Sequence, residues 1–472
     1  MNYIGTRGYT IFKSNISNEQ SRKIKKDLIV KPFSTHAQEI SYPIFRESDK
    51  KFYLPRYYGI EEFGVPVNRI SKGIDINLEF NGTLRDYQYK IIDKYIAHVG
   101  SSGGGLLDVE PGKGKTVMAL NIISKLKKKT LVIVHKSFLM NQWIERIEQF
   151  LPNAKVGRIQ GTVIDTKDKD IVLGMLQSLS NKEYPDSLWS EFGLCVFDEC
   201  HHLSAEVFSN VMIQIVTNYN LGLSGTMTRK DGLSKVFKYF IGPVVHKEST
   251  DVTAEVIVKT ITYENDSMFD NVKTNFKGEP LYSCMISKLD DESRNQLISN
   301  VVKKELEVNP DQQIMILAHT KSLVQNLHKL ISDFEPSIGY YLGGMKEEHL
   351  KETETKKVIL GTYAMASEGL DIKTLTTLVL ATPKSDVCQS VGRILRSNHV
   401  HPLVIDILDQ HPLFESQYRK RVTYYNSKFY RIEEYENYVS YMDNKAKIHR
   451  RSREPKQTKK TLVKEVECFV DF

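Results

Sequence analysis

Two carboxylates, two cysteines and two histidines lie within the ten residues CVFDECHHLS at positions 195–204. Side chains of these types support two different chemistries. Cysteine and histidine ligate zinc, whereas neighbouring carboxylates hold Mg²⁺ and remove a proton from water. The spacing of these residues and the rest of the chain must decide between the two chemistries.

The spacing argues against zinc. Cys195 lies inside the apolar run LCVF, and Cys200 follows it by five positions, so the two side chains would point to opposite faces of a strand. A structural zinc site needs four converging ligands, usually including a CxxC-type pair. The chain has five scattered cysteines and no such pair: Cys195, Cys200, Cys284, Cys388 and Cys468.

The two acids favour a magnesium site. They follow a buried strand, and the carboxyl edge of a parallel sheet is where such sheets bind ligands. We therefore expect Asp198 to hold Mg²⁺ through water, and Glu199 to orient and deprotonate an attacking water molecule.

The loop PGKGKT (111–116) is a candidate phosphate site. It joins a short apolar stretch to a helix, and free N–H groups at a helix N-terminus favour a phosphate. Gly112 and Gly114 let the backbone wrap the anion. Lys115 can reach the β- and γ-phosphates, and the Thr116 hydroxyl can ligate Mg²⁺. The strict pattern GxxxxGK[ST] has glycine at its first position, where this chain has Val109.

The segment QSVGRILR (389–396) contains cations that could act on the same phosphate groups. Arg393 and Arg396 are three residues apart and would share one face of a helix, with Gln389 one turn earlier. Two guanidinium groups presented by a second domain could neutralise charge on a γ-phosphate, as an arginine finger does. The alternative is an ordinary basic helix face.

Two sets of apolar runs must position these residues. Short β-branched or aliphatic runs alternate with amphipathic segments, which predicts buried parallel strands joined by right-handed crossovers. The fold class is therefore α/β, with two parallel-sheet domains in tandem. The first set of strands is expected at 130–135, 170–175, 194–199 and 221–226, and the second at 313–319, 357–363, 377–382 and 403–408.

The chain divides into five predicted regions. Residues 1–75 are rich in proline and tyrosine and read as a small, β-containing N-terminal domain that could recognise the substrate. The first α/β domain is expected at 76–250, a polar linker at 251–290 and the second α/β domain at 291–440. The basic segment 441–472 reads as an exposed tail.

Composition restricts the class of protein. The 472 residues are 40% hydrophobic and 26% charged, as in a water-soluble globular protein. No apolar run approaches the roughly 18 residues needed to span a membrane, and the N-terminus lacks the apolar core of a secretion signal. Unpaired cysteines fit a reducing, intracellular compartment. The net charge of +7 leans weakly towards polyanionic partners.

Taken together and in this order, the motifs resemble those of superfamily 2 helicases. PGKGKT, DECH, SGT (224–226), SEGLDI (367–372) and QSVGRILR are similar to motifs I, II, III, V and VI of that family. DECHH, the loop YYLGG (340–344) and the segment LRDYQ (84–88) further resemble the group that contains XPB, the phage helicase UvsW and transcription helicases of large cytoplasmic DNA viruses. Arg229, Lys230 and Asp231 resemble the RED tripeptide of XPB, with lysine in place of glutamate.

The resemblance covers roughly residues 80 to 420 and implies two RecA-like domains with ATP between them. It implies that Gln88 reads the adenine edge. Ser224 and Thr226, with help from His201, would couple the ATP site to a nucleic-acid strand. Motifs I and V add the nucleotide-binding candidates Glu110, Pro111, Lys113, Gly369 and Asp371.

The resemblance also implies contacts between the chain and the backbone of the strand. Trp143 is expected in the core and not as a stacking platform. The candidate strand contacts are Lys136, Ser137, Gln177, Thr320, Lys321, Gly343, Gly344 and Thr362.

The sequence thus predicts an ATP- and Mg²⁺-dependent helicase or translocase in repair, recombination or transcription, more readily on DNA than on RNA. An RNA helicase is one alternative, although Cys200-His201 replaces the Ala-Asp of the DEAD box. A second is an ATP-switched translocase or assembly factor that does not separate strands. We expect a monomer that meets transcription or replication machinery and no membrane, in the cytoplasm, the nucleus or the virion of a large DNA virus.

Overall fold

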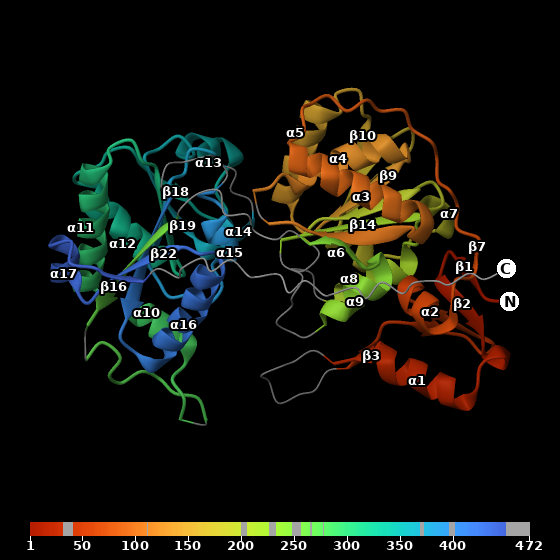
Figure 1. The fold of residues 1–472 in the computed structure, drawn as a ribbon, viewed down its shortest axis with the longest axis horizontal. Coiled ribbons are helices and arrows are strands. Elements are labelled where there is room, and N and C mark those ends of the chain that lie inside the picture. Colours follow the sequence, from red (N-terminus) through yellow and green to blue (C-terminus); the bar gives the residue numbers. More distant parts are fainter. Residues whose placement is uncertain are drawn as a thin grey trace, which may run out of the picture. The chain divides into compact units, whose positions relative to one another are not determined.

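The computed structural model describes residues 1–31, 41–110, 112–199, 205–225, 233–247, 256–264, 267–276, 278–368, 372–395 and 402–449. The chain separates into two compact units (Figure 1). Unit 1 comprises Met1–Thr250 and the short segment Ala364–Lys373, and unit 2 comprises the rest. Within the described ranges, no helix is both long and apolar enough to cross a membrane.

The main sheet of unit 1 contains the expected first set of strands. Its order is β11-β10-β12-β9-β13-β14-β8-β15, and every pairing except β10 with β11 is parallel. Uniformly buried residues form its central strands, as the apolar runs predicted. The strands are β8 (Gly104–Asp108), β9 (Thr130–Val134), β10 (Val156–Gln160), β11 (Val163–Asp165), β12 (Ile171–Met175), β13 (Leu194–Phe197), β14 (Tyr219–Ser224) and β15 (Val244–Lys247).

Helices connect these strands and form a hydrophobic core with each face of the sheet. One core holds α3 and α4, and the other holds residues of α8 and α9. The helices are α3 (Asp86–Ser102), α4 (Lys115–Leu126), α5 (Ser137–Phe150), α6 (Leu176–Ser180), α7 (Asp186–Trp189), α8 (Ala205–Gln214) and α9 (Ser234–Ile241).

The N-terminal region is β-containing, as expected, but it is part of unit 1 and packs against its main domain. Its small sheet has the order β5-β6-β2-β1-β7. One face of this sheet joins the core that contains Phe208 and Phe240 of unit 1. The Arg56 guanidinium also donates to the Asn218 carbonyl at 2.9 Å. The elements are β1 (Tyr3–Gly5), β2 (Gly8–Phe12), η1 (Lys13–Asn15), α1 (Asn18–Leu28), β3 (Ile29–Val30), β4 (Tyr42–Pro43), β5 (Arg46–Glu47), β6 (Lys51–Leu54), α2 (Arg56–Phe63) and β7 (Val67–Asn68).

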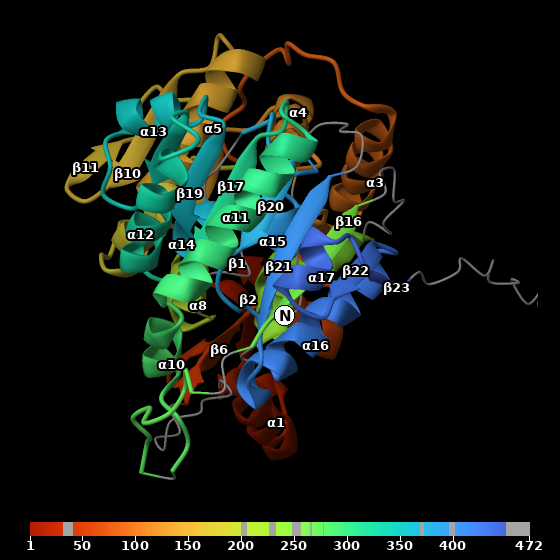
Figure 2. The same cartoon turned by 90° about the vertical axis from the view of Figure 1, so that its left-hand side faces the viewer.

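Unit 2 contains the second set of strands. Its sheet has the order β18-β19-β17-β20-β21-β16-β22-β23, parallel except for β22 with β23. Figure 2 shows this sheet with α11 and α12 in front of it. The strands are β16 (Ile257–Tyr263), β17 (Ile314–Ala318), β18 (Ile338–Tyr341), β19 (Val358–Thr362), β20 (Thr377–Leu380), β21 (Leu403–Asp409), β22 (Arg431–Tyr435) and β23 (Lys447–His449).

The helices of unit 2 follow the same alternation with strands. Buried residues of α11, α12 and α16 share one core with the sheet. The helices are α10 (Tyr282–Lys288), α11 (Glu292–Val308), α12 (Lys321–Ser332), α13 (Glu347–Thr353), α14 (Tyr363–Glu368), α15 (Cys388–Val391), α16 (Pro412–Ser427) and α17 (Tyr438–Met442).

Two predicted boundaries differ from the structure. The expected linker 251–290 contains β16, which lies between β21 and β22 inside the sheet. Polar residues in its sequence IVKTITY interrupt the apolar pattern that would have predicted a buried strand. Lys259 is neutralised by an ion pair of 2.6 Å with Glu305. The expected tail contributes β23, which pairs with β22. Residues 450–472 lie outside the described ranges.

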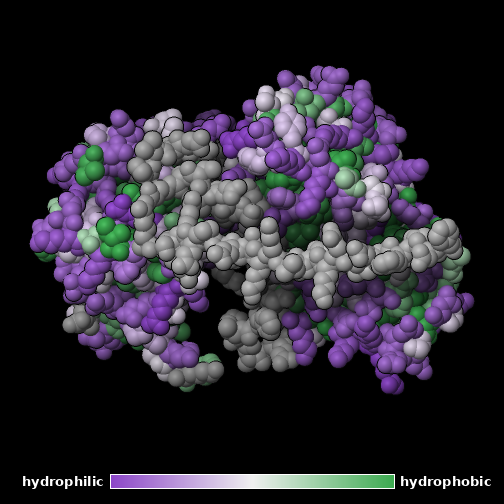
Figure 3. Space-filling view, viewed as in Figure 1, coloured by the Kyte–Doolittle hydropathy of each residue, from purple (hydrophilic) through white to green (hydrophobic). Residues whose placement is uncertain are grey.

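Most of the described surface seen in Figure 3 is hydrophilic. This agrees with a fold whose apolar side chains are gathered into the cores named above.

Candidate active site

The phosphate loop lies between β8 and α4, as expected. Gly112 and Gly114 have φ angles of +83° and +78°, a left-handed conformation that glycine adopts without strain. A Cβ at Gly114 would also collide with the side-chain amide nitrogen of Gln88. Gly114 is the N-cap of α4, so the first free N–H groups of that helix begin at the loop. Pro111 lies outside the described residues.

Gln88 in the first turn of α3 supports this loop. Its Nε2 donates to the carbonyl of Lys113 at 3.0 Å, and its Oε1 accepts from the N–H of Arg85 at 2.9 Å. The Tyr87 hydroxyl donates to the same Lys113 carbonyl at 2.9 Å. The buried Gln88 amide is therefore fixed beside the loop, and its contact with adenine stays a prediction.

The packing of Val109 explains why valine and not glycine stands at the first position of the loop. Its side chain is fully buried in the core of unit 1. Its N–H donates to the Ser224 carbonyl at 2.9 Å, and its carbonyl accepts from Lys115 Nζ at 3.3 Å. The first position of the loop is thus a packing position here. Glu110 follows it and accepts a backbone hydrogen bond of 3.4 Å from Lys113.

Lys115 and Glu199 meet at the carboxyl edge of the sheet. The register aligns Asp108 of β8 with Ser224 of β14, so β8 and β14 end together; β13 ends beside them at Phe197. There Lys115 Nζ lies 3.2 Å from Glu199 Oε1. Glu199 has a φ angle of +48°, an unfavourable conformation for this residue and one often retained at functional positions.

Asp198 has a partner that the sequence did not reveal. The indole N–H of Trp143 on α5 donates to Asp198 Oδ2 at 2.8 Å. Burial and, next, the neighbouring Glu199 carboxylate raise the pKa of Asp198 to about 6, while the Trp143 bond opposes the rise. Trp143 is buried as expected. A buried indole normally donates its N–H to an acceptor. That rule could have predicted a polar partner for Trp143, although not which residue it is.

Ser224 at the end of β14 is fully buried beside the start of the phosphate loop. Thr116 is half-buried in the first turn of α4. Several predicted site residues lie outside the described ranges, and their roles stay predictions: Cys200, His201, Thr226, Arg229, Lys230, Asp231, Gly369, Asp371 and Arg396.

The candidate strand contacts of unit 1 gather at one place. Lys136 is the N-cap of α5, which begins at Ser137. Gln177 Nε2 donates to the carbonyl of His135 at 3.1 Å, which brings the start of α6 beside the start of α5. Gln160 Nε2 reaches Ser137 Oγ at 3.1 Å. Burial lowers the pKa of Lys136.

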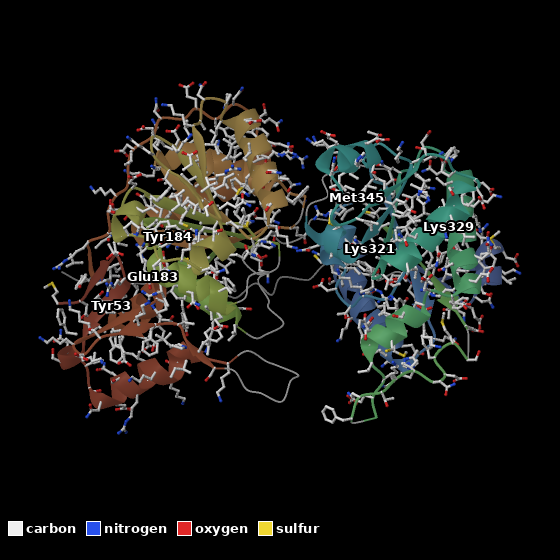
Figure 4. All side chains as sticks on the ribbon, turned by 180° about the vertical axis from the view of Figure 1, so that it is seen from behind. Tyr53, Glu183, Tyr184, Lys321, Lys329 and Met345 are labelled. Carbon is white, nitrogen blue, oxygen red and sulfur yellow. The ribbon has the colours of Figure 1, made fainter. Side chains whose placement is uncertain are left out.

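The candidate strand contacts of unit 2 also gather at carboxyl ends of strands. Thr320 caps α12, and Lys321 Nζ donates to the carbonyl of Gly343 at 3.3 Å. Figure 4 labels Lys321 and Met345, and Met345 belongs to the same loop after β18. Gly344 has a φ angle of +92°. Thr362 ends β19, in register with Ala318 of β17.

The expected helix around Gln389 and Arg393 is short. The regular helix α15 ends at Val391, before the arginines. The N–H of Arg393 bonds to the Ser390 carbonyl and that of Ile394 to the Val391 carbonyl, which is the tighter 3₁₀ spacing. The glycine at 392 disfavours a regular α-helix. Arg396 lies outside the described ranges, so the shared face of Arg393 and Arg396 stays a prediction. Arg393 is buried to 9% exposure.

Comparisons with known proteins identify the family. A family model described as "Type III restriction enzyme, res subunit" matches residues 81–229. A protein of Acanthamoeba polyphaga mimivirus, named "Putative ATP-dependent RNA helicase L396", is 35% identical over 453 residues, which cover 92% of this chain and 86% of that protein. The chain belongs to the superfamily 2 helicases. As a helicase it is an ATP-using enzyme that binds nucleic acid.

Two further proteins are similar to this helicase. "DNA 3'-5' translocase XPB2" of Sulfurisphaera tokodaii is 24% identical over 410 residues, which cover 76% of this chain and 88% of that protein. The solved structure of S. cerevisiae Dbp5 bound to RNA and ADP BeF3 matches with a TM-score of 0.53 and 10% identity, over 75% of this chain and 91% of that one. The second match shows the fold alone, and it confirms the prediction of tandem RecA-like domains.

Proposed function

We propose that this helicase hydrolyses ATP with Mg²⁺ in order to move along or unwind DNA. The observation that carries the proposal is the ion pair of 3.2 Å between Lys115 and Glu199, beside the buried Asp198. It brings a phosphate-binding cation and a candidate general base together at the mouth of a glycine loop that ends in free helix N–H groups.

The residues present fit a nucleotide and a metal ion. The left-handed glycines leave space for an anion, and the Asp198 carboxylate and Thr116 hydroxyl are oxygen ligands of the kind Mg²⁺ prefers. When bound, the ion would neutralise charge on the phosphates. The hydrogen bond from Trp143 holds the Asp198 carboxylate in one orientation.

Lys115 and Glu199 change partners in the proposed cycle. A phosphate offers Lys115 more negative charge than one carboxylate does, so nucleotide binding draws the ammonium group away from Glu199. Glu199 can then accept a proton from water. Arg393 and Arg396 are the proposed cations of the second domain, and the neutral Gln389 is proposed to act beside them. Arg396→Ala should spare ATP binding and remove hydrolysis.

Two features support DNA as the track. The XPB2 relative is named a DNA translocase, and the segment DECH lacks the Ala-Asp of the DEAD box. The candidate contacts at the starts of α5 and α12 are hydroxyls, amides and lysines that would hold a strand of any sequence. RNA is the second candidate, because the mimivirus relative is named an RNA helicase.

ATP turnover measured with single-stranded DNA, duplex DNA and RNA of matched sequence tests the choice. We expect stimulation by DNA, and stimulation by RNA alone would overturn the DNA assignment. A strand-displacement assay beside a triplex-displacement assay separates unwinding from translocation on an intact duplex. We propose work in transcription, repair or recombination within a reducing compartment as the setting.

A further inference from the structure

The outer face of the N-terminal sheet carries an aligned row of aromatic and basic side chains. The register places Val67, Tyr3, Thr10, Tyr53 and Arg46 side by side across β7, β1, β2, β6 and β5. Side chains alternate between the two faces of a strand, so these residues share one face. Phe12 and Lys51, paired one step along, share it as well.

The inner face of the same sheet is occupied by the protein core. Ile4, Tyr9, Ile11, Phe52 and Leu54 are almost fully buried there. The aromatic residues of the outer face are instead partly exposed. Tyr53 is labelled on this sheet in Figure 4. The outer face therefore presents rings that the fold does not need for its own core.

Cations lie over these rings. The guanidinium of Arg69 is 4.6 Å from the centre of the Tyr3 ring, and that of Arg7 is 5.5 Å from the Tyr53 ring. The ammonium of Lys51 is 4.7 Å from the Phe12 ring and 5.6 Å from the Tyr3 ring. We call Tyr3, Arg7, Phe12, Arg46, Lys51, Tyr53 and Arg69 the outer face.

No acid neutralises the outer face within the part of the chain that the structure describes. Among those residues, Arg7, Arg46, Lys51 and Arg69 form no ion pair. A different edge of the domain offers a contrast.

Lys13 and Lys25 also lie over a ring, that of Phe52, but both pair with Glu47, at 2.8 and 3.0 Å. The bond from Lys13, in particular, lowers the pKa of Glu47. These two lysines therefore already have their counter-charge, and the four cations of the outer face do not.

We infer that the outer face binds single-stranded nucleic acid, as a surface additional to the strand contacts at the sheet edges. Unneutralised cations attract phosphates, and partly exposed rings stack with unpaired bases of any sequence. The inference deepens the proposed function and rests on its nucleic-acid substrate. It does not depend on ATP turnover.

The combination of groups selects the ligand. A duplex offers phosphates, but its base faces are stacked within the helix and cannot reach the rings. An acidic peptide offers charge without a planar partner for three rings. A single strand supplies phosphates and unstacked bases in alternation.

Equilibrium binding of a fluorescent oligothymidylate in the absence of nucleotide, measured over a series of salt concentrations, tests the inference. Each lost phosphate contact should reduce the slope of log affinity against log salt by about 0.7 for a single strand. The variant Arg7→Gln/Arg69→Gln should therefore reduce the slope by roughly 1.4 and weaken binding at low salt.

Lys13→Gln/Lys25→Gln is the matched control, because it removes the same net charge from lysines that Glu47 already neutralises. We expect it to keep the wild-type slope and ATP turnover. If both double variants changed the slope equally, the effect would come from overall charge and the outer face would not be a binding site.

The stacking part of the inference has its own test. Tyr53→Leu removes a ring from a partly exposed position and should weaken oligothymidylate binding roughly 5- to 100-fold. It should not weaken binding of an abasic oligonucleotide of the same length, which has phosphates but no bases. Equal losses on both, or an equal loss on a duplex, would overturn single-strand stacking. A lack of ATP turnover with normal binding would instead count against the proposed function.

Discussion

The two units bury charged side chains in different ways, although both are parallel sheets covered by helices. In unit 1, Lys115 forms an ion pair with Glu199, and the Trp143 indole donates a hydrogen bond to Asp198. Contacts of this kind can be exchanged for a ligand.

In unit 2, two fully buried arginines, Arg421 and Arg294, each hold a carboxylate by two hydrogen bonds. Arg421 donates to both oxygens of Asp406 at 2.7 and 2.9 Å and to the Lys384 carbonyl at 2.8 Å. Arg294 donates hydrogen bonds to both oxygens of Asp409 at 2.6 and 2.9 Å. Two-point contacts hold a planar group in one geometry. The comparison teaches that the two-point carboxylate contacts of the buried arginines in unit 2 serve structure, whereas the Lys115–Glu199 pair in unit 1 stands where a ligand can replace it.

The largest expected effect comes from the exchangeable pair. Glu199→Gln removes the candidate base and should lower ATP turnover roughly 10²- to 10⁴-fold, while ATP binding and melting temperature stay near wild type. Lys115→Ala should abolish turnover as well. Steady-state hydrolysis and nucleotide binding by fluorescence check this, with the exposed Glu148→Gln on α5 as control. Near-normal turnover in Glu199→Gln would assign the base to another residue.

The two-point contacts of unit 2 should show the opposite pattern. Arg421→Met leaves the Asp406 carboxylate buried without its main partner, which should cost about 3–5 kcal/mol of stability in unit 2. Arg419→Met is the control on the same helix, because its ion pair with Glu415 is exposed and contributes less than about 1 kcal/mol.

Chemical denaturation measures both variants. The double variant Arg421→Met/Asp406→Leu should recover much of the lost stability, since it removes both buried charges. A single variant as stable as the wild type would show that the pair is not structural.

A smaller effect is expected from Trp143. Trp143→Phe keeps an aromatic ring in the core and removes the N–H bond to Asp198, a bond to a charged group worth about 1.5–3 kcal/mol. We expect ATP turnover to need roughly tenfold more Mg²⁺, as a magnesium titration would show. Trp189, the other tryptophan, lies in a different part of unit 1, and Trp189→Phe should leave the magnesium requirement unchanged.

The smallest expected effect is a change in acid sensitivity. Burial and, next, Lys384 lower the pKa of His319 to about 4, from 6.5. The unfolded chain therefore binds a proton at this residue between pH 6.5 and 4 and the folded chain does not, so stability falls as the pH drops through that window.

His319→Asn retains a polar atom near the Thr382 hydroxyl, which the imidazole meets at 2.7 Å, and no longer titrates. The difference in melting temperature between pH 7.5 and pH 5 should be smaller in this variant than in the wild type. An identical difference would mean that other groups cause the acid loss.

Sequence reasoning reached the strands and the nucleotide loop because local patterns determine both. Uniform apolar runs predict buried strands, and a glycine loop before an apolar helix predicts a phosphate site. It missed β16 because Lys259 and its neighbours break the apolar run, and only the distant Glu305 makes that lysine tolerable in the sheet.

Two other features depend on contacts between residues far apart in the chain. The indole of Trp143 reaches Asp198 only once α5 has packed on the sheet. The N-terminal strands looked like a separate small domain, yet their buried residues complete a core with Phe208 and Phe240. No periodic pattern in the sequence indicates either contact.

That shared core has a practical consequence for dissecting this helicase. The first seventy residues cannot be removed as an independent domain, because their buried side chains pack against α8 and α9. Cutting them away would uncover apolar side chains and break the anchorage of Arg56. A shortened chain would then report on aggregation, and only point changes on the surface can show what the N-terminal region recognises.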